Sequence, residues 1–269
     1  MAEFLPLAIT RYPLLPCNAA NAEFNKEEIM KFKTIIFILF LAAPLFAQKI
    51  SAPVTNLPNS YKLENYAYSV GFAGNYGIPV WEMHMVTPYL FQKAWTVSYE
   101  WRTDNRVKGY RLTPKDFEGT ELEVVQLFPK EHAGDSVDNQ ESAFLTSNIV
   151  FMTKQIKESI WDKITNSFQE ITEKMRLSYL YAGPVFDKNP LKTKYMMNNK
   201  VGTPLYFYRM ALYFEDDKPV CKCYKIPNRH LTDYERKCDI DEYEYNVFQL
   251  EADSGIDFFP DEIDAQLKK

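Results

Sequence analysis

The stretch LTSNIVFMTKQIKESIWDKITNSFQEITEKM, residues 145–175, contains the clearest helix signal in the chain. Apolar residues recur three or four positions apart from about Lys154 to Met175, with charged residues between them, as in an amphipathic helix. The residues that carry this pattern are Ile156, Ile160, Ile164, Phe168, Ile171 and Met175. The pattern predicts one helix over about 154–175.

Short strand-like segments lie on both sides of this helix, rich in Val, Tyr and Phe. They span residues 67–72, 80–86, 123–128, 178–182, 204–214 and 221–226. The first two flank turn residues at 74–77 and predict a β-hairpin. Strands grouped around a few helices predict an α+β fold with a mainly antiparallel sheet flanked by helices.

The N-terminal part of the chain predicts export. From Met30 the sequence reads MKFKTIIFILFLAAPLFAQ, with two lysines, an apolar run and a small residue, Ala47, before Gln48. This order is typical of a signal peptide over 30–47. The apolar run of about 12 residues is shorter than the roughly 20 needed to span a bilayer. We therefore expect no transmembrane segment once the signal is removed, and a periplasmic or secreted protein.

The rest of the chain divides simply. Residues 1–29 precede the signal and are predicted to lie outside the fold. Residues 48–65 are punctuated by Pro and Asn and predict an extended arm, and residues 66–269 predict the folded domain. The chain carries 31 basic and 36 acidic residues. This acidic balance gives no overall attraction for a polyphosphate backbone, which counts against constitutive nucleic-acid binding.

Three cysteines follow the leader: Cys221, Cys223 and Cys238. In an oxidising compartment Cys238 could pair with either of the other two, leaving one thiol. With His230 the three cysteines form an alternative zinc set, although the spacing is irregular and C-x-C is tighter than usual. Free buried thiols are the third interpretation.

Six local blocks, taken in order, resemble the DNA/RNA non-specific endonuclease family. They are YSVGF with PVWE (68–72, 79–82), RLTPKDFEG (111–119), LTSNI (145–149) with Trp161 behind it, AGPVF (182–186), PLYFYR (204–209) and SGIDFFP (254–260). The resemblance covers about residues 66–262. It implies a ββα-metal core within a larger domain of sheet and helices.

The resemblance also implies an active site, and the chain departs from it. The family's Asp-Arg-Gly-His motif, whose histidine deprotonates the attacking water, aligns with residues 123–126. Glu123 replaces the aspartate, Val124 the arginine and Gln126 the histidine. An amide has no accessible protonation change, so Gln126 cannot act as a general base.

The helix departs from the family in the same way. Asn148 is retained, and counting from it the asparagine that holds a hydrated Mg²⁺ in the family falls on Lys157. An ammonium has no lone pair and repels Mg²⁺. The glutamate that orients the metal's waters falls on Thr165. Lys157, Trp161 and Thr165 are four residues apart and predict one stripe of the helix.

Together these positions predict an exported nuclease homologue that has lost phosphodiester hydrolysis and acts as a binding or interaction module. No cofactor is expected. Lys157 is the candidate for holding an anion, whether nucleic acid or another anionic ligand, weakly; a protein partner is not identified.

Two alternatives stay open. A divergent metal-dependent endonuclease, with Mg²⁺, would use Glu123 or His132, and would need Glu123, Asn148 and His132 to converge on one cleft. The other alternative is an interaction protein stabilised by zinc or a disulfide, in which the nuclease-like cleft has no role in function. The histidines His84, His132 and His230 are otherwise interpreted as ordinary core or surface residues.

Overall fold

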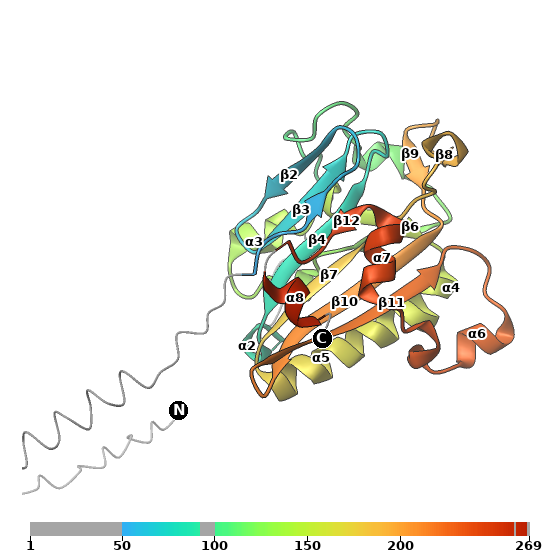
Figure 1. The fold of residues 1–269 in the computed structure, drawn as a ribbon. Coiled ribbons are helices and arrows are strands. Elements are labelled where there is room, and N and C mark those ends of the chain that lie inside the picture. Colours follow the sequence, from blue (N-terminus) through green and yellow to red (C-terminus); the bar gives the residue numbers. More distant parts are fainter. Residues whose placement is uncertain (1–49, 92–99, 261, 268–269) are drawn as a thin grey trace, which may run out of the picture. The chain divides into compact units, whose positions relative to one another are not determined.

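A six-stranded antiparallel sheet forms the centre of the molecule (Figure 1). The computed structural model describes residues 50–91, 100–260 and 262–267. The order in the sheet is β11-β10-β7-β4-β3-β2. These strands are β2 (Ser60–Glu64), β3 (Tyr68–Ala73), β4 (Pro79–Val86), β7 (Ser178–Val185), β10 (Tyr206–Glu215) and β11 (Lys218–Pro227).

Three small ladders complete the strands. They pair β1 (Val54–Thr55) with β12 (Ile256–Asp257), β5 (Glu123–Gln126) with β6 (Ile149–Met152), and β8 (Lys194–Met196) with β9 (Val201–Thr203). The helices are α2 (Pro88–Phe91), α3 (Val137–Ser142), α4 (Lys154–Ile156), α5 (Asp162–Met175), α6 (Asp233–Lys237), α7 (Val247–Ser254) and α8 (Glu262–Leu267). Short 3₁₀ turns span Pro114–Asp116, Lys130–His132, Thr146–Asn148, Pro190–Lys192 and Ile240–Tyr243.

The two faces of the sheet are covered by different parts of the chain. On one face α5 packs against β10 and β7, and its Phe168 also contacts the ring of Tyr224 on β11 at 5.8 Å between centroids. On the other face the C-terminal segment packs through Phe258, whose ring contacts Tyr181 and Tyr208. Figure 1 shows α7 and α8 (red) in front of the strands. The sheet is therefore buried on both sides.

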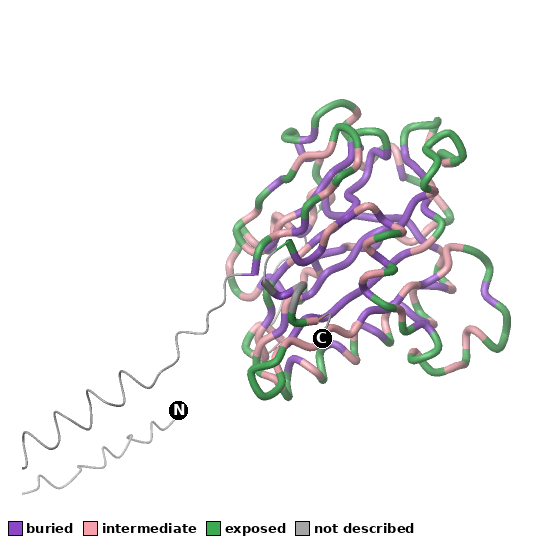
Figure 2. Tube along the Cα trace, viewed as in Figure 1, coloured by how far each residue is buried: buried purple, intermediate pink, exposed green. Residues whose placement is uncertain are grey.

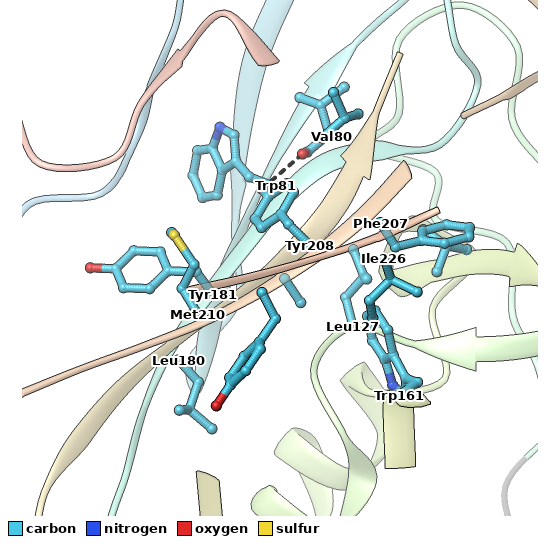
Figure 3. Packing of buried hydrophobic residues seen from close by; sticks show 14 of the residues in the cluster. Val80, Trp81, Leu127, Trp161, Leu180, Tyr181, Phe207, Tyr208, Met210 and Ile226 are labelled. Atoms are coloured by element: carbon cyan, nitrogen blue, oxygen red, sulfur yellow. Dashed lines mark hydrogen bonds between the residues drawn. The ribbon is translucent and has the colours of Figure 1, made fainter. Parts of the chain in front are cut away.

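The central strands are buried along most of their length, and exposed residues gather in the loops (Figure 2). Figure 3 shows Trp161 beside Phe207 and Leu127, which places the helix against β10. On the opposite face the Tyr208 hydroxyl donates to the Val80 carbonyl at 3.1 Å. These contacts hold the helix against the sheet. It is the helix that the sequence pattern predicted.

Close approach of Trp81 to β3 requires a glycine. A Cβ built on Gly71 would lie 2.0 Å from the Trp81 indole nitrogen, closer than any side chain tolerates. That nitrogen donates to the Thr55 hydroxyl at 2.7 Å, which ties β1 to the sheet. A glycine here lets a large ring lie flat against the strand.

The α+β fold, the mainly antiparallel sheet and the six strand positions predicted from the sequence are confirmed. The predicted helix over 154–175 is also present, but residues 157–161 form a π-helical turn between α4 and α5. The segment predicted as an extended arm contains β1 and β2, so its second half belongs to the sheet. The upstream extension and the signal peptide, 1–47, lie outside the described residues. None of the helices in the described ranges has the length and apolar character required to cross a bilayer.

Candidate functional site

A ββα unit lies beside the main sheet. Strands β5 and β6 pair with Gln126 opposite Ile149, and the helix follows directly. Thr153 caps the helix, because its hydroxyl accepts from the Ile156 N–H at 3.3 Å. This is the arrangement that the resemblance implied for a ββα-metal core.

A cleft of 540 Å³ opens where this unit meets β10. Among the residues that line it are Val124, Gln126, His132, Lys157, Trp161, Thr165 and Arg209. Four of the six degenerate positions named from the sequence therefore lie in one cleft. Glu123, at the start of β5, and Asn148, which is buried, do not line it.

The Gln126 side chain is held by the backbone on both sides. Its amide nitrogen donates to the Ala143 carbonyl at 2.8 Å, and its oxygen accepts from the Lys130 N–H at 3.3 Å. Because donor and acceptor are both used, the side chain supports the loop that follows β5. An amide has no accessible protonation change, so this side chain does not act as a base.

Lys157 forms an ion pair inside the cleft. Its Nζ lies 2.9 Å from the Asp162 carboxylate, and both side chains are partly exposed. The π-helical turn explains the pairing, because a π turn bonds residues five apart and the Asp162 N–H donates to the Lys157 carbonyl. At the position that the resemblance aligned with the family's metal-holding asparagine, the helix thus carries an ammonium paired with a carboxylate.

Thr165 and Arg209 are linked on the next turn. The Thr165 hydroxyl donates to the Trp161 carbonyl at 2.9 Å and accepts from Arg209 Nη1. Arg209 is 1% exposed, and its guanidinium lies over the rings of Trp161 and Phe168, 4.7 Å and 5.7 Å from the centroids. Burial lowers its pKa to about 10, partly offset by Glu82 and Asp162, so it stays charged at neutral pH.

Two histidines and a glutamate form a buried chain that ends at the cleft. Glu82 Oε1 lies 2.7 Å from His84 Nδ1, and His84 Nε2 lies 2.8 Å from His132 Nδ1. All three residues are buried, and His132 lines the cleft. The interpretation of both histidines as ordinary core or surface residues agrees with their burial. It did not predict their pairing, which joins residues 48 positions apart.

Burial also determines the protonation of Glu82, His84 and His132. Desolvation lowers the pKa of His84 to about 3 and that of His132 well below its ordinary value, and the charge of Arg209 adds to both effects. Desolvation raises the pKa of Glu82 well above its ordinary value, although Arg209 opposes this. Both histidines are therefore neutral near pH 7, and burial favours the protonated form of Glu82.

Arg209 and Glu82 belong to the same row of the sheet. Glu82 on β4 and Arg209 on β10 both lie opposite Ala182 on β7, so all three side chains point to one face. Arg209 ends the block PLYFYR, which resembles the family, but the resemblance did not assign this residue to the cleft. A basic residue in the middle of a predicted strand was the signal that could have identified it.

The residues present do not fit a hydrated Mg²⁺. Such an ion is held through oxygen ligands, usually one or two carboxylates. The helix stripe presents the ammonium of Lys157 and the occupied hydroxyl of Thr165, and Asp162 is already paired. Glu123 and Asn148 do not reach the cleft.

Asn148 supports the backbone. It is fully buried, accepts from the Phe128 N–H at 2.8 Å, and donates to the carbonyls of Phe128 and Ala143 at 2.9 Å and 3.0 Å. This asparagine therefore joins the loop that follows β5 to the residues just before β6. Its retention needs no metal.

The zinc site considered for Cys221, Cys223, His230 and Cys238 does not form. Burial raises the pKa of Cys221 to about 12 and that of Cys223 well above its ordinary value, so both thiols stay protonated, and His230 is exposed. Cys238 donates to the Glu235 carbonyl at 3.3 Å. Within the described ranges no three His, Cys, Asp or Glu side chains are grouped to hold a metal. All three cysteines are free thiols, so of the three interpretations left open by the sequence the structure has neither the zinc set nor the disulfide.

Known proteins share this architecture. The first relative is the mitochondrial nuclease EXOG of Danio rerio, 23% identical over 141 residues, which are 48% of this chain and 40% of that protein. The chain thus matches less than half the length of this relative. The fold is similar to that of a chain in the crystal structure of the EndoG/EndoGI complex, which concerns the mechanism of EndoG inhibition. The two superpose with a TM-score of 0.68 at 16% identity, covering 80% of this chain and 91% of the other. The sequence model of the DNA/RNA non-specific endonucleases matches residues 47–265, so the chain belongs to the DNA/RNA non-specific endonuclease family.

Proposed function

We propose that this chain is an exported member of its family that has lost phosphodiester hydrolysis and binds a ligand in its cleft. One observation carries the proposal: Gln126, Lys157 and Thr165 lie in the cleft where the family has base, metal ligand and water-orienting group, and each is bonded to the protein itself. Loss of a general base costs about 10²–10⁴ in rate, and loss of the metal's contribution is additional.

Export is part of the proposal and rests on the sequence of residues 30–47. A protein released by signal cleavage would meet nucleic acids and other polyanions outside the cytoplasm. Cell fractionation with an antibody to the chain, and N-terminal sequencing of the product, test this part. A product that begins upstream of Gln48 and stays with the cytoplasm argues against export.

A divergent endonuclease remains the second candidate, and the buried chain that ends at His132 is the observation that favours it. A neutral imidazole in a cleft can accept a proton. The arrangement expected for that enzyme, with Glu123, Asn148 and His132 converging, is absent from the cleft, which only His132 of these three lines.

Plasmid nicking and RNA degradation by the purified mature chain, with Mg²⁺ or Mn²⁺, separate the two candidates. We expect no cleavage above a buffer blank at neutral pH. The matched variants are His132→Phe in the cleft and His230→Phe on the surface. Metal-dependent cleavage that follows the protein peak, is abolished in His132→Phe and persists in His230→Phe would establish the enzyme instead.

A further inference from the structure

A second pocket lies apart from the cleft and shares none of its lining residues. Its volume is 340 Å³, and its walls are mostly apolar: they include Leu57, Pro58, Tyr76, Phe186 and Pro190. The rings of Tyr76 and Phe186 stack with their centroids 3.8 Å apart. This apolar pocket suits an aliphatic or aromatic group rather than an ion.

The side of the apolar pocket formed by Asp253 carries more positive than negative charge. Lys188 lies 3.4 Å from one oxygen of this carboxylate, and Lys225 pairs with the other. The Tyr245 hydroxyl donates to the second oxygen at 2.9 Å. Because two lysines share one carboxylate, an anion can approach this side without being repelled.

A basic lobe, residues 187–203, lies beside the apolar pocket. Figure 1 shows its strands β8 and β9 at the edge of the molecule, away from α5. The lobe contains four lysines and one acidic residue, Asp187, which gives it a net charge of +3 in a chain of net charge −5. Two of the lysines pair with aspartates, whereas Lys192 and Lys194, both exposed, have no ion pair or hydrogen bond within the described ranges. The lobe therefore opposes the charge of the whole chain.

The lobe also holds a leucine in water. Leu191 is 94% exposed, although hydrogen bonds define the 3₁₀ turn that carries it. The Asn189 side chain accepts from the Leu191 N–H at 3.1 Å, and the Lys192 N–H donates to the Asn189 carbonyl at 2.9 Å. Pro190 begins the same turn. The leucine is thus presented in a fixed position, next to a lysine that has no partner among the described residues.

The lobe and the apolar pocket form one surface. The Gly202 N–H on β9 donates to the Tyr76 carbonyl at 2.8 Å. A Cβ built on Gly202 would lie 3.0 Å from the rings of both Tyr76 and Phe186, so the hairpin packs directly on the stacked pair. Pro190, the neighbour of Leu191, lines the pocket. An apolar hollow, an exposed leucine and unpaired lysines therefore lie together.

We propose that the basic lobe and the apolar pocket bind a membrane surface that contains anionic phospholipid. Lysines beside a negatively charged surface are attracted to it, and an aliphatic side chain among them inserts between the headgroups. The apolar pocket accommodates part of an acyl chain. A nucleic acid would use the lysines but would leave Leu191 in water, so the lipid surface fits better. The inference goes beyond the proposed function and does not depend on it.

Flotation with phospholipid vesicles tests this surface. The chain that begins at Gln48 is used, because residues 50–269 form a compact unit and the apolar run upstream would itself bind lipid. We expect binding at low salt to vesicles of phosphatidylglycerol and phosphatidylcholine, weaker binding at high salt, and none to phosphatidylcholine alone. No binding to the anionic vesicles, or equal binding to both kinds, overturns the proposal.

A double lysine variant locates the charge. Lys192→Ala with Lys194→Ala should weaken binding roughly 25-fold, since each lysine near an anionic surface contributes about fivefold. Lys218→Ala with Lys237→Ala makes the same change of charge at exposed positions outside the lobe, and should weaken binding less than threefold. Equal losses in the two double variants would mean that the lobe is not the contact surface.

Leu191 separates a lipid surface from general attraction to polyanions. Leu191→Ser should weaken vesicle binding about fivefold or more, whereas Val137→Ser, at a 56% exposed position on α3, should not change it. In Leu191→Trp the added emission, measured against the wild type, should shift to shorter wavelength with anionic vesicles and be quenched by brominated acyl chains. Wild-type affinity in Leu191→Ser, with unshifted emission in Leu191→Trp, overturns the lipid surface in favour of attraction by charge alone.

Discussion

The buried chain Glu82–His84–His132 should give folding stability an unusual dependence on pH, and Glu82→Gln is the perturbation that exposes it. In the unfolded chain the histidines titrate near 6.5 and the glutamate near 4.5. In the folded protein both histidines stay neutral below 6.5 and Glu82 stays protonated above 4.5. The depressed histidine pKa values cost stability as pH falls through 6.5. The raised Glu82 pKa costs stability as pH rises above 4.5.

The net slope follows from counting protons. Between about pH 4.5 and 6.5 the unfolded chain gains protons on two histidines, and the folded protein keeps one on Glu82, so the unfolded state binds one more. Stability from this chain therefore rises by about 1.4 kcal/mol per pH unit in that window. Above 6.5 only Glu82 differs, and stability falls by about 1.4 kcal/mol per unit until its folded pKa is reached.

Glu82→Gln removes the titrating carboxyl group and keeps an uncharged side chain that can donate a hydrogen bond to His84. In this variant only the two histidines make the free energy of unfolding depend on pH. Their contribution should rise by about 2.8 kcal/mol per unit as pH increases to 6.5 and should be flat above it. Urea unfolding of both proteins at pH 5 to 8 gives the difference in unfolding free energy, in which all other titrating groups cancel. Parallel curves would mean that Glu82 is ionised in the folded protein. The hydrogen bonds of the chain would then run the other way, and His132 Nε2 would be an acceptor.

Two further predictions concern residues outside the cleft. Asn148→Leu leaves the buried N–H and carbonyl of Phe128 without the partners that Asn148 supplies, and the Ala143 carbonyl keeps only Gln126, so urea unfolding should show a loss of about 3 kcal/mol; a loss below about 1 kcal/mol contradicts the structural role. The thiols of Cys221 and Cys223 should react with a thiol reagent only upon unfolding, and reductant should leave the melting temperature unchanged; rapid labelling of the native protein, or a lower melting temperature, contradicts free buried thiols.

Periodicity in the sequence predicted the strands and the long helix because each has a repeating apolar face that must be buried. It did not predict the π-helical turn at 157–161, which contains neither glycine nor proline. The turn brings Asp162 to Lys157, so the charge that the sequence predicted for the cleft is paired.

Side chains that meet across the fold were beyond local patterns. Glu82 and His84 alternate on one strand and so share a face, which the sequence does indicate. Their link to His132 depends on how a distant 3₁₀ turn packs against β4, and no spacing encodes that. The cysteines show the converse. Their spacing suggested a metal or a disulfide, whereas burial of the Cys221 and Cys223 thiols, which raises the pKa of both, depends on how other segments pack against β11.

A nicking assay on two restored variants decides whether hydrolysis was lost at the aligned cleft positions. The first variant is Gln126→His alone, and the second adds Val124→Arg, Lys157→Asn and Thr165→Glu. Because a base without a metal lacks its electrophilic partner, the wild type and the single variant should leave supercoiled plasmid intact in Mg²⁺, while the fourfold variant nicks it. Nicking by the wild type or by Gln126→His alone would contradict this account, because it would place a working metal site somewhere other than at Lys157.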